Sequence, residues 1–296
     1  MAQENGLMEE VQPEDFRSES TPQVATSERL NDISAGVAGW LRDLWHYREL
    51  LFFLAWRDFR LRYRQTLLGI IWALIQPLFT MIVFTVLLGM VVKVPSDGIP
   101  YPVFFYAALL PWIYFSSVVG LSAVSLISNA SLITKVYFPR VFLPASPALT
   151  GLVDLGISSL LLVGLFVWYG VPFTWKIALW PGLVLLLFIL TLSVGILLAA
   201  SNVRYRDIKH ALPLVIQLWL YATPVIFPLS LVPERFRALA LLNPLTGIVE
   251  AFRASCSPTV SVDWAALSAS IAVTGILLVI SLLYFTKVER DFADIA

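Results

Sequence analysis

Cysteine and histidine are scarce in this sequence, whose 296 residues include one cysteine and two histidines. The single cysteine, Cys256, excludes an internal disulfide, and we expect its thiol to be a small, unreactive side chain. His46 and His210 lie far apart in the sequence and lack the spacing of metal ligands. The sequence therefore predicts no metal or cofactor in this chain.

Motifs for nucleotide chemistry are lacking as well. No segment matches G-x-x-x-x-G-K-[ST], and there is no Gly-Lys pair, which excludes a phosphate-binding loop of this type. Any energy from ATP would have to come from a partner subunit. A membrane-embedded glycosyltransferase or polymerase would need paired carboxylates or an acidic motif in a sizeable loop, and neither occurs. We therefore expect a protein that is not an enzyme.

Charged residues are also few, at 14% of the chain, whereas hydrophobic residues reach 58% and the mean hydropathy is +0.81. A soluble domain of this length cannot bury so much apolar surface, so the composition indicates a membrane protein. The first charge-free run, residues 67–92, is long enough to cross a bilayer, at about 1.5 Å per residue. The prediction is an all-α integral membrane protein with six transmembrane helices, at about 67–92, 102–128, 145–169, 177–200, 211–230 and 264–286. The fifth is the least regular, because it holds three prolines.

The charge is distributed unevenly, because residues 1–50 carry ten acidic and four basic side chains while the remainder carries ten acidic and sixteen basic. Residues 1–36 are expected to be a disordered acidic tail, since they have too little apolar surface to offset the entropy cost of ordering. No charged-then-apolar leader opens the sequence, so the first span is expected to direct insertion. The other predicted regions are an interfacial helix region at 37–66, the six-span domain at 67–290 and a cytoplasmic tail at 291–296.

Basic residues favour one orientation of the six spans. With both termini in the cytoplasm, the inner segments from residue 57 onward hold eleven lysines and arginines and the outer segments hold five. Short cytoplasmic segments of membrane proteins are enriched in these residues. We therefore predict that both termini are cytoplasmic.

A basic and aromatic segment precedes the first span. At about 100° per residue, Phe52, Trp56, Phe59 and Tyr63 fall on one stripe of a helix at residues 47–65. The arginines next to this stripe are Arg57, Arg60 and Arg64. We predict an amphipathic helix lying flat on the membrane, with its rings at headgroup level and its guanidinium groups near phosphates. A simple positive-inside anchor is the alternative.

The inner loop SNASLITKVYFPRVFLP, residues 128–144, is too apolar and aromatic for an ordinary solvated connection. Pro139 and Pro144 interrupt it, which favours a short helix of two or three turns. We interpret this helix as a docking element for a cytoplasmic partner, with packing at the membrane interface as the alternative.

On the outer side, residues 231–262 contain an apolar stretch broken at Asn243 and Pro244. Neither half is long enough to span, so we predict two short reentrant helices between spans five and six. Glu250 is either paired, with Arg253 as the preferred partner, or part of an exit path.

Within the spans, Asp154 is the only charged residue. An intramembrane carboxylate is a candidate functional group by default, and the alternative is pairing with a base from the cytoplasmic rim. The spans also carry many aromatic residues, whose faces would suit sugar rings, although such residues gather at membrane interfaces in any case. The candidate channel aromatics are Trp72, Phe79, Phe84, Trp112, Tyr114, Phe115, Trp219 and Tyr221.

Four ordered segments make this sequence similar to the permease subunits of ATP-binding-cassette exporters for cell-surface polysaccharides, the O-antigen and teichoic acid export family. The resemblance covers nearly everything from residue 46 to residue 290. The segments are WRDFRLRYRQTLLGIIWALIQPLFTMIVFTVLLG (56–89), SNASLITKVYFPRVFLP (128–144), NVRYRD (202–207) and YATPVIFPLSLVPERFRALALLNPLTGIVEAFR (221–253).

The resemblance implies a homodimer that encloses a continuous channel in the inner membrane of a bacterium, surrounded by membrane lipids. Two copies of a nucleotide-binding ATPase subunit, which hold ATP and Mg, would bind beneath it. The cargo would be an undecaprenyl-linked polysaccharide of the O-antigen or teichoic acid type, and no nucleic acid is implied.

The resemblance also gives expected roles to the three non-spanning segments. The loop residues expected to couple to the ATPase are Lys135, Tyr137, Phe138, Pro139 and Arg140. The residues expected at the entrance, where they would meet the lipid pyrophosphate, are Arg57, Arg60, Arg62 and Arg64. The residues expected at the outer gate are Asn243, Pro244 and Glu250. Which arginine meets the pyrophosphate is left open.

Two other transport functions remain open at this point. The first is export of a drug or a small lipid, which related exporters with the same six-span arrangement carry out. A proton-coupled flippase for lipid-linked glycans is the second, although inverted repeats and several intramembrane charges would then be expected.

Overall fold

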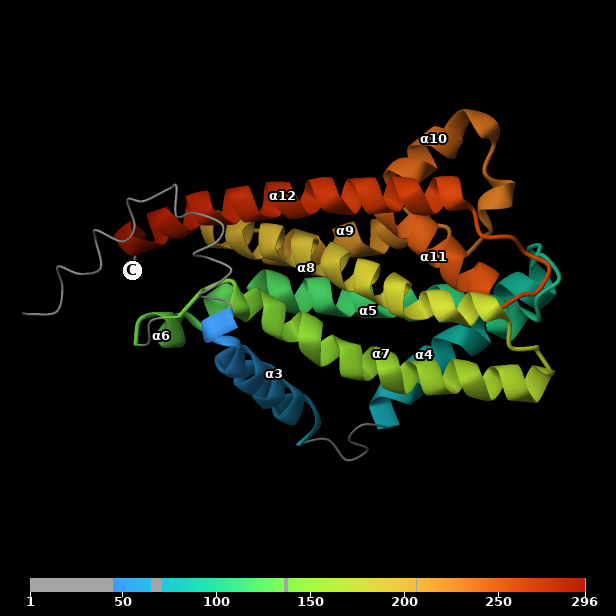
Figure 1. Ribbon diagram of the computed structural model, residues 1–296, viewed down its shortest axis with the longest axis horizontal. Helices are drawn as coiled ribbons and strands as arrows, with labels where there is room; N and C mark the ends of the chain where they lie inside the picture. The colour runs from blue at the N-terminus through green and yellow to red at the C-terminus, as the bar shows by residue number, and fades with distance from the viewer. Residues whose placement is uncertain (1–44, 65–70, 136–137, 206, 296) are drawn as a thin grey trace, which may run out of the picture. The chain divides into compact units, whose positions relative to one another are not determined.

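The computed structural model of the chain describes residues 45–64, 71–135, 138–205 and 207–295 (Figure 1). The predicted acidic tail at 1–36 lies outside these residues. Contacts divide the chain into Met1–His46 and Tyr47–Ala296, and all the elements below belong to the second unit. Every regular element among the described residues is a helix, in agreement with the predicted all-α class.

Five helices in the described part of the chain are long and apolar enough to cross a membrane. They are α4 with its continuation η2 (Trp72–Val91), α5 (Tyr101–Ser128), α7 (Phe142–Tyr169), η3 with α8 (Trp175–Arg204) and Trp264–Glu289 of α12 (Trp264–Ile295). Within these, α4 is Trp72–Phe84, η2 is Thr85–Val91, η3 is Trp175–Leu179 and α8 is Trp180–Arg204. Each lies close to a predicted charge-free window. The protein is thus a multi-pass membrane protein.

The predicted span at 211–230 is not confirmed. Its helix, α9, covers only Ile208–Ala222, which at about 1.5 Å per residue is well short of a bilayer core. Thr223 is extended, with φ −101° and ψ 140°, because the following Pro224 disfavours a helical conformation at the residue before it. The residues that the structure describes therefore contain five candidate spans, where the sequence predicted six.

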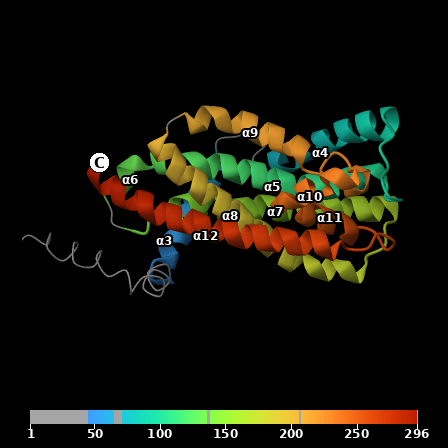
Figure 2. The same ribbon diagram turned by 90° about the horizontal axis from the view of Figure 1, so that it is seen from above.

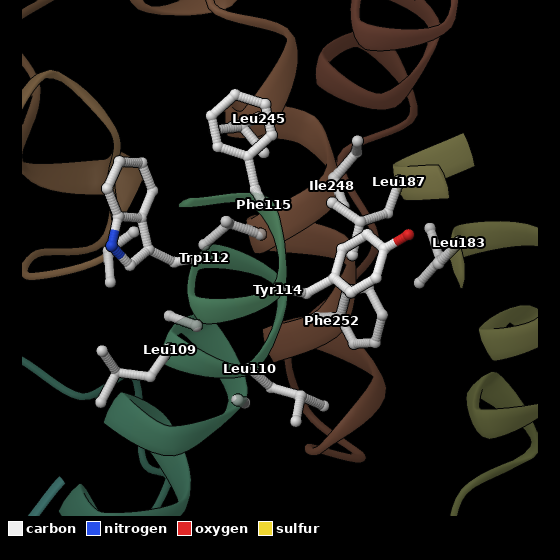
Figure 3. Packing of buried hydrophobic residues seen from close by; sticks show 14 of the residues in the cluster. Leu109, Leu110, Trp112, Tyr114, Phe115, Leu183, Leu187, Leu245, Ile248 and Phe252 are labelled. Carbon is white, nitrogen blue, oxygen red and sulfur yellow. The ribbon is translucent and has the colours of Figure 1, made fainter. Parts of the chain in front are cut away.

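Helix α5 is the centre of the bundle. Most of its residues are buried, and it packs against α7, α8, α11, α4 and α9. Figure 2 shows α4 and α9 on one side of α5 and α12 on the other. Leucine and aromatic side chains from α5, α8 and α11 form the core, as the close-up in Figure 3 shows.

Small residues allow close approach at two helix crossings. A Cβ added to Gly151 of α7 would lie 2.5 Å from Val118 and 3.0 Å from Tyr114 of α5. A Cβ added to Gly247 of α11 would lie 2.2 Å from the carbonyl oxygen of Ala266 in α12. Close backbone packing at small residues is typical of helices that associate in membranes.

The non-spanning elements lie at opposite ends of the bundle. Helices α3 (Arg48–Tyr63) and α6 (Ala130–Ile133) are near one end, together with the C-terminal end of α12 (Figure 1). Helices α10 (Glu234–Leu242) and α11 (Pro244–Ser255) are near the other, next to the short turn η4 (Leu229–Leu231).

Candidate functional site

A groove of about 850 Å³ lies between α3, α4, α5 and α7. Its walls combine aromatic rings with hydroxyl and amide groups, including Trp72, Gln76 and Thr80 of α4 and Trp112 and Ser116 of α5. Concave sites of this size, largely apolar with a few placed polar groups, are typical of ligand binding. The groove is therefore the candidate site for cargo.

Two tyrosines fix the wall between α5 and α7. The hydroxyl of Tyr106 donates to the carbonyl of Ser158, and that of Tyr114 donates to the carbonyl of Ala148, both at 2.9 Å. Both tyrosines line the groove. Because each hydroxyl is held by a backbone carbonyl, the rings are kept in place along the groove.

The structure brings together only some of the candidate channel aromatics. Those that line the groove are Trp72, Phe84, Trp112 and Tyr114. Phe115 is buried and makes an edge contact with Trp219, with ring centroids 5.0 Å apart. Phe79 and Tyr221 are exposed and do not line the groove. Hydropathy identifies the rings of a span but not the direction in which each points.

At the α3 end of the groove, Asp154 of α7 is paired. Its carboxylate accepts hydrogen bonds from Arg62 Nη1 and from the hydroxyl of Tyr63, both on α3. Burial first, and then the hydrogen bond to Asp154, raises the pKa of the Tyr63 hydroxyl to about 12. Of the two readings left open for Asp154, the structure shows the paired one, and the base is Arg62.

Helix α3 makes several polar contacts with the first half of α7. Ser146 and Thr150, which precede Asp154 at intervals of four residues on α7, also contact α3. Ser146 Oγ donates to Asp58 at 2.6 Å, and Thr150 Oγ1 donates to the carbonyl of Ala55 at 3.1 Å. Residues four apart share a helix face, so one face of α7 holds α3 in place. The orientation of α3 relative to the membrane stays a prediction, and the polar contacts with α7 could not be read from α3 alone.

The predicted aromatic stripe of α3 does form. The ring centroids of Trp56 and Phe59 are 5.7 Å apart, and those of Phe59 and Tyr63 are 5.1 Å apart. Phe52, by contrast, is 70% exposed. The stripe is therefore continuous over the second half of the helix.

The four arginines predicted at the entrance, three in α3 and one directly after it, have four different surroundings. Arg57 donates to Asp58 at 2.7 Å and to Asn129 at 3.1 Å. The guanidinium of Arg60 lies 5.1 Å from the centroid of the Trp56 ring. Arg64, at the end of α3, is exposed. Arg62 alone among them lines the groove.

The inner loop contains less helix than predicted. Between the end of α5 and the start of α7, the only helical segment among the described residues is α6, a single turn at Ala130–Ile133, rather than two or three turns. Asn129 ends α5, and its Nδ2 donates to the Ser125 carbonyl at 2.8 Å. Pro139, which has no N–H to donate, stands where a longer helix would continue. The prediction was wrong in length.

The five expected coupling residues differ in exposure. Lys135 is exposed, Phe138 is buried, and Pro139 and Arg140 are half-buried. Arg140 Nη1 donates to the carbonyl of Glu289 in α12 at 3.3 Å. Tyr137 lies outside the described residues.

The segment at 231–262 contains two short helices that meet at Asn243, as predicted, while their reentrant placement stays a prediction. Asn243 caps α11 by accepting from the N–H of Leu245, and its Oδ1 also accepts from Trp219 Nε1, each at 3.1 Å. Its Nδ2 donates to Thr223 Oγ1 at 2.8 Å. Pro244 is the first residue of α11, where its missing N–H has no helical partner to lose. Asn243 therefore joins α11 to the end of α9.

Arg253 and Glu250 form an ion pair at 3.0 Å, as preferred from the sequence. Arg253 is only 2% exposed, and its guanidinium also donates to the carbonyls of Phe227 at 3.0 Å and Val225 at 2.5 Å. Glu250 Oε1 accepts from the N–H of Leu229 at 3.0 Å. Burial raises the pKa of the Glu250 carboxyl, and the nearby Arg253 opposes that rise. The carbonyl contacts were not predicted, because they come from a loop whose conformation the sequence does not specify.

The described residues contain no group of three or more His, Cys, Asp or Glu side chains placed to hold a metal ion. The chemistry that this arrangement offers is binding: stacking surfaces, hydroxyl groups and one paired arginine along a groove. Three of the candidate spans, α4, α5 and α7, line that groove.

These features define a membrane permease, and the family model for the ABC-2 type transporter matches residues 49–256. The chain therefore belongs to the ABC-2 type transporter family. It is 36% identical over 257 residues to the O-antigen export system permease protein RfbA of Myxococcus xanthus, covering 86% of this chain and 98% of that protein.

Two further relatives are named for related transport functions. An O-antigen export system permease protein RfbA of Klebsiella pneumoniae is 31% identical and covers 83% of this chain and 95% of its own length. The polysialic acid transport protein KpsM of Escherichia coli is 27% identical, with coverage of 79% and 91%. The resemblance to polysaccharide exporter permeases that the sequence segments predicted is thus confirmed.

Proposed function

We propose that this chain is the membrane permease of an ATP-driven exporter of cell-surface polysaccharide. The observation that carries the proposal is the 36% identity with an O-antigen export permease over nearly the whole length of that protein. The family and the relatives are transport subunits, which agrees with a chain that has no phosphate-binding loop. Export from the bacterial inner membrane, with both termini cytoplasmic, belongs to the same proposal.

The groove supports a glycan as cargo. Indole and phenol rings at Trp72, Trp112 and Tyr114 offer flat faces to the C–H-rich side of a sugar ring, and nearby hydroxyls offer hydrogen bonds. We propose that the glycan enters attached to undecaprenyl pyrophosphate, whose lipid stays in the bilayer. Small-lipid or drug transport is less well supported, because the three relatives described above are named for O-antigen or polysialic acid.

Two ATPase subunits and a second copy of this chain complete the proposed exporter, with ATP and Mg held in the ATPase. The inner loop is the proposed docking site: Lys135 is exposed for contact, while buried Phe138 anchors the loop. Motion of the loop would reach α12 through Arg140 and Glu289, and α3 through Asn129 and Arg57.

The outer end has a proposed gating role. Asn243 and Pro244 mark the joint between α10 and α11, and Glu250 is tied to Leu229 next to the α9–α10 connection. In the proposal, α10 and α11 move as a unit hinged at Asn243, and the cargo leaves beside them.

Deleting the gene and measuring surface polysaccharide tests the proposal. Export should stop, with lipid-linked glycan accumulating inside the cell, and plasmid-borne wild-type protein should restore it. The purified chain with the ATPase encoded beside it should show ATPase activity stimulated by undecaprenyl-linked glycan. A hydrolysis-deficient ATPase variant is the control. Unchanged surface glycan in the deletion strain, or stimulation only by drugs or short lipids, would contradict the proposal.

A further inference from the structure

The sequence left open which of four arginines meets an anionic cargo group, and the structure separates them. Arg57 is held by Asp58 and Asn129, and Arg60 lies over Trp56. Arg64 is exposed beyond the groove. Arg62 lines the groove, so its guanidinium is the one that a ligand lying in the groove can reach.

Arg62 has more donors than its observed partners use. Asp154 accepts from Nη1, and the neighbouring Tyr63 hydroxyl also shares a hydrogen bond with this side chain. Guanidinium offers five N–H donors in a planar fork that matches the oxygens of phosphate groups. The hydroxyl of Tyr63 points at the same carboxylate from the next position on α3. Two neighbouring donors thus converge on one anion.

We propose that Arg62 and Tyr63 form a binding site for a phosphate-type anion at the α3 end of the groove, which the Asp154 carboxylate occupies until the ligand displaces it. The inference rests on the proposed function and deepens it, since it names the residues that meet the pyrophosphate of the lipid carrier. The phosphodiester of an anionic phospholipid has the same chemistry.

Displacement is feasible because the pair is not sealed in a dry interior. The side chains of Arg62 and Asp154 are 27% and 24% exposed, so the released carboxylate can be solvated in the groove. A pyrophosphate carries more negative charge and more acceptor oxygens than one carboxylate, which favours the exchange. A carboxylate left next to a bound anion would also be repelled.

The exchange would loosen one end of α3 only. The contacts of Asp58 with Ser146 and of Ala55 with Thr150 do not involve the anion site. Helix α3 would therefore stay attached to α7 near the inner loop, while its C-terminal end, at Arg62 and Tyr63, is released. Anion binding at the groove is thereby linked to the position of α3.

The test measures lipid binding to the full-length chain in nanodiscs of phosphatidylcholine, with undecaprenyl pyrophosphate as probe and undecaprenol as the uncharged control. Arg62→Gln is expected to weaken binding of undecaprenyl pyrophosphate about tenfold or more, the loss of a charge-assisted hydrogen bond. Asp154→Asn is expected to strengthen it severalfold, because the competing charge is removed. Arg64→Gln should change it less than twofold, and undecaprenol binding should not respond to any of these substitutions.

The double variant R62Q/D154N distinguishes a folding defect from a loss of anion binding. It removes both charges, so neither side chain is left as an unpaired charge. It should bind undecaprenyl pyrophosphate as weakly as R62Q. Equal weakening by R62Q and R64Q, weaker binding by D154N, or the same changes with undecaprenol would overturn the inference.

A parallel series with phosphatidylglycerol in the nanodiscs identifies the source of the anion. If phosphatidylglycerol competes with undecaprenyl pyrophosphate and the competition depends on Arg62, the site binds the anionic lipid of the bilayer. If phosphatidylglycerol does not compete, the site binds the pyrophosphate of the carrier lipid. Failure of this inference is distinct from failure of the proposed function. A wild-type chain that exports glycan while R62Q and D154N bind like wild type would refute the anion site alone.

Discussion

The guanidinium carbon of Arg253 in α11 lies 4.0 Å from the ring centroid of Phe104 in α5. Together with Glu250 and the carbonyls of Val225 and Phe227, this contact surrounds a charge that is almost completely buried. The connection after α9 is thereby fastened to α11, and α11 to the centre of the bundle.

Replacing Arg253 by methionine should destabilise the folded protein by about 3–5 kcal/mol, because Glu250 is left as an uncompensated buried charge. Thermal unfolding of the detergent-solubilised chain measures the effect. The double variant E250Q/R253M should recover part of the loss, since it removes both charges. A single variant as stable as wild type would show that Arg253 does not hold the outer segment.

Replacing Gly247 by alanine should disrupt the α11–α12 crossing, because the added Cβ would meet the backbone of Ala266. Gly275 of α12 is the matched control, since a Cβ there has nothing within 4 Å. Gly275→Ala should be neutral or stabilising by up to about 1 kcal/mol, given the higher helix propensity of alanine. The two variants are compared by yield and melting temperature, and equal behaviour would contradict the close packing.

Cys256 should resist alkylation in the folded protein. Its thiol is 1% exposed, and burial raises its pKa to about 12. A raised pKa keeps the proton on sulfur, so the thiolate fraction near pH 8 falls about a thousandfold and recovers only as the pH approaches 12. Labelling with a maleimide at pH 8 should be slow until a denaturant is added. A Ser131→Cys substitution in a Cys256→Ser background, on the exposed side of α6, should react at once. Fast labelling of native Cys256 would contradict its burial.

Trp72→Ala should lower polysaccharide export about fivefold, the equivalent of about 1 kcal/mol of lost stacking. Phe79→Ala is the comparison on the same helix, because Phe79 does not line the groove. Surface glycan is measured at matched protein levels. If both substitutions reduce export equally, the groove is not the route of the cargo.

Asn129→Ala should reduce export while ATP hydrolysis by the assembled complex continues, because the hydrogen bond between the inner loop and Arg57 of α3 is lost. Ser128→Ala at the adjacent position is the control, since Ser128 Oγ contacts only carbonyls of its own helix. Parallel loss of ATPase activity in the asparagine variant would indicate failed assembly instead.

Much of the helical layout follows from the sequence, because a bilayer requires long apolar helices and five of the six predicted runs form such helices. The pair Glu250 and Arg253 was predictable as well, since residues three apart on a helix are neighbours. Asp154 needed a partner, but the choice of Arg62 depends on how α3 packs, which no local pattern encodes. For the same reason, the short α9, the single turn of α6 and the inward or outward direction of each aromatic ring were missed.

The burial of α11 has a consequence for biosynthesis. Residues Gly247 and Ser270 join α11 to α12 through a 3.0 Å hydrogen bond, yet α12 is the later of the two to leave the ribosome. While the last span is still being translated, α11 lacks the packing contacts that α12 later provides. Maturation of the outer end therefore waits for insertion of α12, and chains that stall before it would expose the apolar face of α11 to membrane quality-control proteases.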